Sequence, residues 1–164
     1  YQKIDDTNLD IDSRNQLVER YKSGYAEDAS ALSAMNSGEL DVREAPGEWS
    51  PREVAHHLAD SEMTSALRLR RLISEEHPVI QGYDQEEFAR RLYYDRPIES
   101  SMAAFKAARD TTAEILEQLS EDEWTRYGTH SESGRYSVLD WLSIYADHAY
   151  IHADQIRRAR AANR

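Results

Sequence analysis

The sequence predicts an all-α protein: a four-helix bundle in which a long connection, carrying a short helix, joins the second and third long helices. Three observations indicate this fold class. Only six glycines and four prolines interrupt the 164 residues, and they gather between long segments. Within those segments apolar residues recur every three or four positions, which is the period of an amphipathic helix. Four such segments are long enough to pack side by side around a common core.

The first two long helices have recognisable starts or ends. The first is predicted over residues 11–35, and a polar Asn-Ser-Gly sequence ends it. The second begins after Ser50, which has the side chain of a good N-cap. Pro51 then occupies the first helical position and Glu53 completes a capping box. This helix is predicted to end before Pro78.

A long connection follows, over residues 79–96. A short helix is predicted to begin within it at Asp84, because Asp84-Gln85-Glu86-Glu87 is another capping-box pattern. The third long helix is predicted after Pro97, with apolar residues on one face.

The last part of the chain contains one turn, one loop and one long helix. A single helical turn is predicted to begin at Ser120. The polar stretch 127–135 contains Gly128 and Gly134, and we expect a loop there. Ser137 then caps the final helix, which is predicted to continue to about residue 161.

Composition limits the chemistry that this chain can perform. Its length is typical of one domain, so we expect residues 1–164 to form a single domain with its own core. The absence of cysteine excludes disulfides, a thiolate nucleophile and Cys-ligated zinc. Any metal ion must therefore be held by His, Asp or Glu side chains.

Charge and hydropathy indicate the expected partners and compartment. The net charge of −11 argues against nucleic acid, because phosphate contacts require clustered Lys and Arg. No apolar run approaches the roughly 20 residues of a membrane span, and no signal-peptide pattern opens the chain. We therefore expect a cytoplasmic protein that binds neither membranes nor nucleic acid.

Two histidines of the final helix are the most informative residues. His148 and His152 are separated by four positions, so both imidazoles lie on one helical face and a single metal ion can bind both. At about 100° per residue they fall in the core-facing stripe, which contains Val138, Trp141, Tyr145, His148, His152, Ile156 and Ala159. The alternative is a pair of packed histidines that hydrogen bond inside the core.

A third ligand is needed, since catalytic zinc usually has three protein ligands plus water. The second helix offers His56 and His57. Relative to Leu58, His57 lies near the edge of the apolar stripe and His56 lies close to its back. His57 is therefore the better candidate ligand, and we expect His56 at the surface. Taken alone, however, His57 could be an ordinary histidine at the boundary of the core.

These motifs, taken in order, resemble a known family. Trp49-Ser50-Pro51-Arg52-Glu53-Val54-Ala55-His56-His57-Leu58-Ala59-Asp60-Ser61-Glu62 and the later His148-Ala149-Tyr150-Ile151-His152-Ala153-Asp154-Gln155-Ile156 are similar to the DinB-like (DinB/YfiT) superfamily. The linking segments 82–85 and 124–130 are similar as well, so the resemblance covers most of the chain. It implies a four-helix bundle, usually a homodimer, with one divalent metal ion on His57, His148 and His152. The adjacent His56 departs from the family pattern.

The resemblance also implies a range of activities. Characterised branches are thiol S-transferases and isomerases that use a low-molecular-weight thiol, and others are described as metal-dependent hydrolases. We expect a metal-dependent enzyme of the thiol S-transferase type. The first alternative is a metal-dependent hydrolase, and the second is a non-catalytic, stress-related binding or dimerisation module with a structural metal. Zinc or nickel is the expected ion, although imidazole also suits iron and copper.

Other site roles rest on weaker signals. Asp60 and Gln155 each follow a candidate ligand by three residues, so each could accept a hydrogen bond from its imidazole. Glu62 and Asp147 are possible bases, and His130 is expected in a surface loop. We expect a pocket that reaches the metal from one end of the bundle, bordered by residues 82–84.

Overall fold

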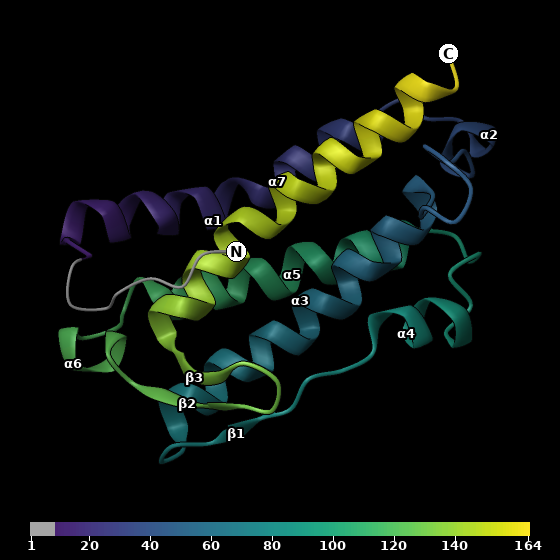
Figure 1. Ribbon diagram of the computed structural model, residues 1–164. Helices are drawn as coiled ribbons and strands as arrows, with labels where there is room; N and C mark the ends of the chain where they lie inside the picture. The colour runs from purple at the N-terminus through teal and green to yellow at the C-terminus, as the bar shows by residue number, and fades with distance from the viewer. Residues whose placement is uncertain (1–8) are drawn as a thin grey trace.

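The computed structural model describes residues 9–164, and the bundle predicted from the sequence is confirmed (Figure 1). Its four long helices are α1 (Ile11–Leu32), α3 (Pro51–Ser74), α5 (Glu99–Leu116) and α7 (Val138–Ala162). Helix α1 packs chiefly against α7, and α3 packs chiefly against α5. Helix α3 also contacts α7, and these two helices carry the histidines singled out above. The first eight residues of the expected domain lie outside the described residues.

The predicted capping residues begin the helices as expected. Ser50 and Ser137 cap α3 and α7, each in a reciprocal capping box. Helix α1 ends at Leu32, three residues earlier than predicted, because Ala34 adopts a left-handed φ of 60°. The short helix α2 (Ser37–Leu40) follows it.

The prediction of a loop over residues 127–135 is wrong. Strands β2 (Tyr127–His130) and β3 (Gly134–Ser137) form an antiparallel hairpin there. Strand β1 (Val79–Ile80), which belongs to the connection, pairs with β2 in parallel and completes a three-stranded sheet. Gly134 supplies the positive φ of 83° that the hairpin turn requires. The partner strand β1 is far away in the sequence, so local polarity gave no sign of the pairing.

The connection between α3 and α5 runs back beside α3 (Figure 1). It contains the predicted short helix, α4 (Gln85–Arg91), whose N-cap Asp84 accepts hydrogen bonds from the backbone N–H groups of Glu86 and Glu87. The predicted single turn is α6 (Glu121–Trp124). Because the connection follows α3, its side chains border the same region of the bundle as the candidate ligands.

Two apolar clusters form the core. One surrounds Trp141 and includes Ala113 of α5, and the other includes Phe105 of α5 and Ile156 of α7. Along α5, the buried Arg109 lies between them and pairs with the buried Glu62 at 3.0 Å. No described helix combines the length and the apolar character that crossing a bilayer demands.

Candidate metal centre

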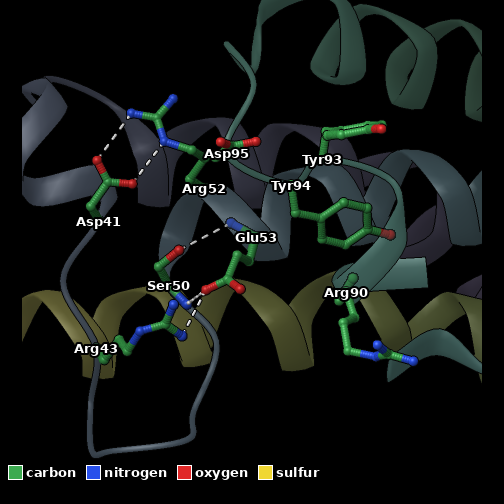
Figure 2. A pocket seen from close by; sticks show the side chains of 10 residues that line it. Asp41, Arg43, Ser50, Arg52, Glu53, Arg90, Tyr93, Tyr94 and Asp95 are labelled. Atoms are coloured by element: carbon green, nitrogen blue, oxygen red, sulfur yellow. Dashed lines mark hydrogen bonds and ion pairs between the residues drawn. The ribbon is translucent and has the colours of Figure 1, made fainter. Parts of the chain in front are cut away.

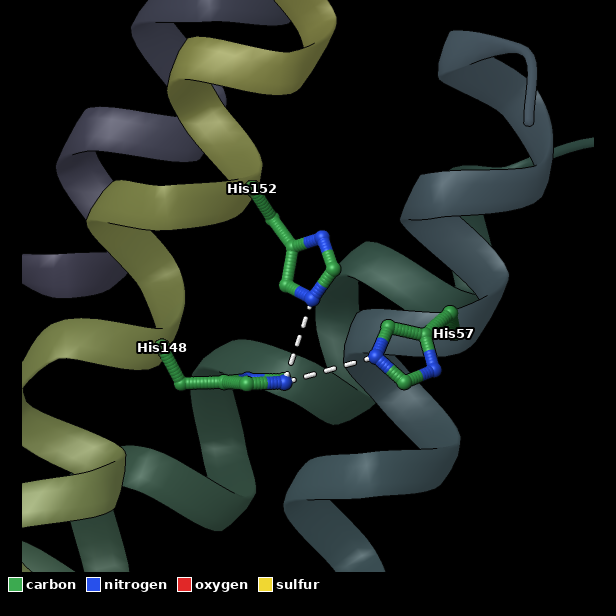
Figure 3. A group of neighbouring side chains, drawn as sticks. All are labelled: His57, His148 and His152. Carbon is green, nitrogen blue, oxygen red and sulfur yellow. Dashed lines mark hydrogen bonds between the residues drawn. The ribbon is translucent and has the colours of Figure 1, made fainter. Parts of the chain in front are cut away.

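Three histidines from two helices meet in the middle of the bundle (Figure 3). His57 comes from α3, and His148 and His152 come from successive turns of α7. The Nε2 atom of His148 lies 3.3 Å from Nε2 of His57 and 3.1 Å from Nε2 of His152. One nitrogen from each ring lies within 4.8 Å of the others. The three side chains that the sequence predicts as ligands, two from α7 and one from α3, therefore lie together in the folded chain.

These distances fit a metal ion. Nitrogen ligands about 2.0–2.1 Å from a tetrahedral zinc ion lie about 3.3 Å from one another. The Nε2 atom of His148 lies 3.3 and 3.1 Å from the Nε2 atoms of His57 and His152, which is close to that value. The donor set also suits a divalent transition metal, because imidazole nitrogen is a preferred ligand of zinc and nickel.

Hydrogen bonding among the rings explains the cluster less well. Nε2 of His148 faces two other Nε2 atoms, yet it carries either one proton or one lone pair in the ring plane. It can therefore make a proper N–H···N bond with only one of them. The remaining contact would be poorly directed at best, whereas a cation placed between three lone pairs would satisfy all three nitrogens.

The environment keeps the three rings neutral. Burial, together with the neighbouring His152, lowers the pKa of His57 to about 3. Burial also lowers the pKa of His148 well below its ordinary value and lowers that of His152. A metal ligand must be the neutral imidazole, so the site holds the protonation state that metal binding requires.

Gln155 orients one of the candidate ligands. Its Oε1 atom lies 2.8 Å from Nδ1 of His152, and because an amide oxygen only accepts, Nδ1 is the donor. Nε2 of His152 then carries the lone pair that faces the cluster. The Nδ1 atoms of His57 and His148 are buried and meet no hydrogen-bond partner within residues 9–164.

Asp60 does not accept a hydrogen bond from His57, so that expected contact is wrong. Its Oδ2 atom accepts a hydrogen bond of 2.7 Å from the Tyr94 hydroxyl. Burial, and then this bond to Asp60, raises the pKa of Tyr94. Three residues after His57 the helix has turned by about −60°, which directs the carboxylate towards the connection instead of the cluster.

The prediction that His56 lies at the surface is also wrong, because its side chain is fully buried. Its Nε2 donates to the backbone carbonyl of Arg96 at 2.9 Å, which leaves Nδ1 to accept from the Ser101 hydroxyl at 2.7 Å. Helix α3 is covered on a second side by α5 and the end of the connection, and a single apolar stripe does not reveal this.

The remaining candidate bases lie outside the cluster. Glu62 accepts hydrogen bonds from Arg109 and from the Tyr21 hydroxyl, both inside the core. Asp147 forms a surface ion pair of 2.7 Å with Arg20. His130 belongs to β2 and not to a loop, and its Nδ1 accepts from the backbone N–H of Glu132.

A cavity of about 260 Å³ reaches the cluster at His152. It borders the connection slightly beyond the expected residues 82–84, and its lining is Gly47, Glu48, Trp49, Gln85, Glu86, His152 and Gln155. The ring of Trp49 lies 4.8 Å from that of His57. Sequence analysis did not identify Glu48, Trp49 or Glu86 as cavity residues, because two separate segments meet only in the folded chain.

The sequence pattern of the DinB superfamily matches residues 21–156, which include all three histidines. The chain belongs to the DinB superfamily.

Relatives in this superfamily have similar chains and the same fold. A protein of Oceanobacillus iheyensis, provisionally named a metal-dependent hydrolase, is 38% identical over 122 residues, covering 74% of this chain and 71% of its own. YfiT from Bacillus subtilis, described as a probable metal-dependent hydrolase with an unusual four-helix bundle topology, superposes with a TM-score of 0.88. The match has 23% identity and covers 95% of this chain and 89% of YfiT.

A more distant structure shares the fold as well. A mycothiol-dependent maleylpyruvate isomerase superposes with a TM-score of 0.73 at 13% identity. The match covers 93% of this chain and 63% of the isomerase. Thus the same bundle occurs in proteins described with hydrolytic and with thiol-dependent chemistry.

Proposed function

We propose that this protein is a metal-dependent enzyme of the thiol S-transferase type, with a divalent ion on His57, His148 and His152. The main support is that three neutral imidazole nitrogens converge, while no carboxylate of residues 9–164 joins the cluster. A bound ion would lower the pKa of a thiol ligand or polarise a carbonyl group of the substrate. The histidines hold the ion, and Gln155 fixes the orientation of His152.

The absence of a free carboxylate beside the three histidines, among residues 9–164, favours a thiol over water as the nucleophile. Three neutral ligands leave the full charge of the ion uncompensated, which stabilises an anionic ligand, either a thiolate or a hydroxide. Hydrolysis usually also needs a general base within hydrogen-bond reach of the attacking water. The carboxylates on the inner part of α3 are committed elsewhere, Asp60 to Tyr94 and Glu62 to Arg109.

Hydrolysis is the second candidate, and the descriptions of the relatives favour it. In that case Glu48 or Glu86, which line the cavity beside His152, would have to act as the base. A third candidate is a non-catalytic module with a structural metal. Structural zinc sites have four protein ligands, and the described part of the chain gathers only three around this point.

We further propose zinc or nickel as the ion and a small thiol as the partner, with a cytoplasmic homodimer as the working form. The thiol dependence of the isomerase with the same fold supports the choice of partner. Elemental analysis of the purified protein identifies the ion, and light scattering gives the oligomeric state.

Cobalt substitution tests the proposed chemistry. We expect small thiols to add a charge-transfer band in the near ultraviolet, since a thiolate ligand on cobalt absorbs there. His148→Ala should lose the band together with the bound cobalt. Absence of the band with each common cellular thiol, alongside turnover of an ester or amide, would establish the hydrolase instead. Absence of both activities would leave the non-catalytic module.

A further inference from the structure

The cavity beside His152 carries unpaired negative charge. Glu48 and Glu86 both line it, and no Lys or Arg does. Neither glutamate has an ion-pair partner among residues 9–164. Arg43 contacts only the backbone carbonyl of Glu48, and its ion pair is with Glu53. Glu86 is not needed as a helix cap either, because Asp84 already binds its backbone N–H group.

A larger cavity shows the contrast. It has a volume of about 390 Å³ and is also lined by charged residues, and Figure 2 shows its Arg43 and Arg52 paired with acidic side chains. Arg52 pairs with Asp41, and Arg43 pairs with Glu53. The third, Arg90, pairs with Glu87 on α4. Each arginine of this larger cavity thus has an acidic partner, whereas both glutamates of the cavity that reaches the histidines lack a basic partner among the described residues.

The rest of the small cavity also suits a cation. Trp49 offers an aromatic ring, and such rings attract ammonium groups that lie over their faces. Gln85 adds an amide group that can accept hydrogen bonds from an ammonium group. Because the cavity touches His152, a molecule with its reacting atom at the cluster would place its neighbouring atoms among these side chains.

We infer that the site selects a substrate or thiol that carries a cationic ammonium group close to its reacting atom, and that Glu48 and Glu86 bind this group beside Trp49. This inference rests on the proposed function for the identity of the reacting atom. It assigns Glu48 and Glu86 to substrate specificity and not to metal binding. It also predicts that anionic small thiols bind poorly, since both carboxylates repel them.

Three short thiols of similar size test this selection: cysteamine, 2-mercaptoethanol and mercaptoacetate, which are cationic, neutral and anionic. Binding to the cobalt-substituted protein is measured by the thiolate band for the wild type and for Glu48→Gln, Glu86→Gln and the double variant. Each thiol is compared only with itself between variants, so its own acidity cancels. Glu114→Gln is the control, because Glu114 is an exposed glutamate of α5 that does not line this cavity.

We expect each single substitution to weaken cysteamine binding about threefold and the double substitution about tenfold, as for ion pairs of exposed carboxylates. Binding of 2-mercaptoethanol should not change, and mercaptoacetate should bind more tightly to the double variant. Added salt should reduce the cysteamine preference of the wild type. Equal losses for all three thiols, or a parallel loss of cobalt affinity, would show that the glutamates serve the metal and would overturn the inference.

A second probe separates this inference from the proposed function. Tetramethylammonium cannot bind a metal, and we expect it to shift the indole N–H resonance of Trp49 in the wild type but not in the double variant. If no thiol gives a cobalt band but this shift occurs, the thiol chemistry is wrong and the cation-binding cavity stands. If thiols bind but show no charge preference and Trp49 does not respond, the cavity inference is wrong and the thiol chemistry stands.

Discussion

His56 and His57 are adjacent in α3, yet they have different partners. His57 faces His148 and His152, whereas His56 binds Ser101 and the backbone carbonyl of Arg96. We predict that His57→Ala loses metal binding. His56→Ala should keep the metal but lower the free energy of unfolding by about 2–3 kcal/mol, because two buried hydrogen bonds and ring packing disappear.

Metal content and urea unfolding of the metal-free forms measure the two effects separately. The metal-free forms are needed because a bound ion stabilises the wild type by itself. If His56→Ala purified without metal while His57→Ala retained it, the assignment of the ligand on α3 would be reversed.

Asp28 predicts a second effect of a single residue, on the pH dependence of stability. It is fully buried in α1, and neither carboxylate oxygen has a hydrogen-bond partner within the described chain. Burial raises the pKa of Asp28 to about 8, although Arg109 and Arg157 oppose the shift. The folded protein therefore holds a proton on Asp28 over a pH range in which the unfolded chain has released it.

The sign of the effect follows from linkage. The stabilisation from protonated Asp28 is complete below pH 4 and is lost as pH rises towards 8, by at most about 1.4 kcal/mol per pH unit. Asp28→Asn removes this loss. We expect the melting temperature of Asp28→Asn to increase relative to that of the wild type between pH 5 and pH 8. The control Asp95→Asn, at an exposed site, should show the same pH dependence of melting temperature as the wild type. Parallel wild-type and Asp28→Asn profiles would contradict the prediction.

At the scale of elements, the contact between α1 and its neighbours depends on Gly24. A Cβ atom there would meet the guanidinium of Arg109 and lie 2.7 Å from Cβ of Ala149 on α7. Arg109 cannot easily withdraw, because it donates to the backbone carbonyls of Tyr21 and Tyr145 as well as to Glu62. The missing side chain thus allows α1, α5 and α7 to approach one another around a buried charge.

Gly24→Ala should therefore destabilise the protein by about 1–3 kcal/mol, through overpacking. In an exposed helix the same change would stabilise by about 1 kcal/mol, so the expected sign is reversed. Ala26→Gly on the exposed side of α1 is the matched control and should cost about 1 kcal/mol. Thermal unfolding of both variants checks this, and an increase in melting temperature for Gly24→Ala would show that α1 adjusts its position.

Local signals and distant contacts explain which elements were predictable. The capping boxes at Ser50 and Ser137 placed the starts of α3 and α7 correctly, since such caps involve only neighbouring residues. The sheet was not predicted because β2 pairs with the distant β1. The backbone N–H of Thr129 in β2 donates to the carbonyl of Pro78, just before β1. A two-residue strand such as β1 carries no periodic pattern of its own.

For the whole molecule, the same distinction separates the candidate ligands from their surroundings. His148 and His152 were predictable because their spacing on one helix fixes their relative position. The location of Glu48 and Glu86 on one cavity depends on how the segment before α3 meets the connection. Sequence patterns within one helix cannot indicate such a meeting, so the cavity and its charge emerge only from the folded chain.

A metal that bridges α3 and α7 should stabilise the whole bundle. Only the folded state brings His57 to the pair on α7, so binding adds about 2.7 kcal/mol when the free ion is at 100 times its dissociation constant. For a chain of this size, chelation should then lower the melting temperature by roughly 5–10 °C. His148→Ala should already melt at the lower temperature and should not respond to the chelator. His130→Ala, a control substitution in β2, should still respond to it.

Calorimetry at several concentrations of free zinc tests the same prediction directly. The melting temperature should rise with the logarithm of the zinc concentration in the wild type and stay constant in His148→Ala. A wild type indifferent to both zinc and chelator would mean that the three rings are packed without a metal.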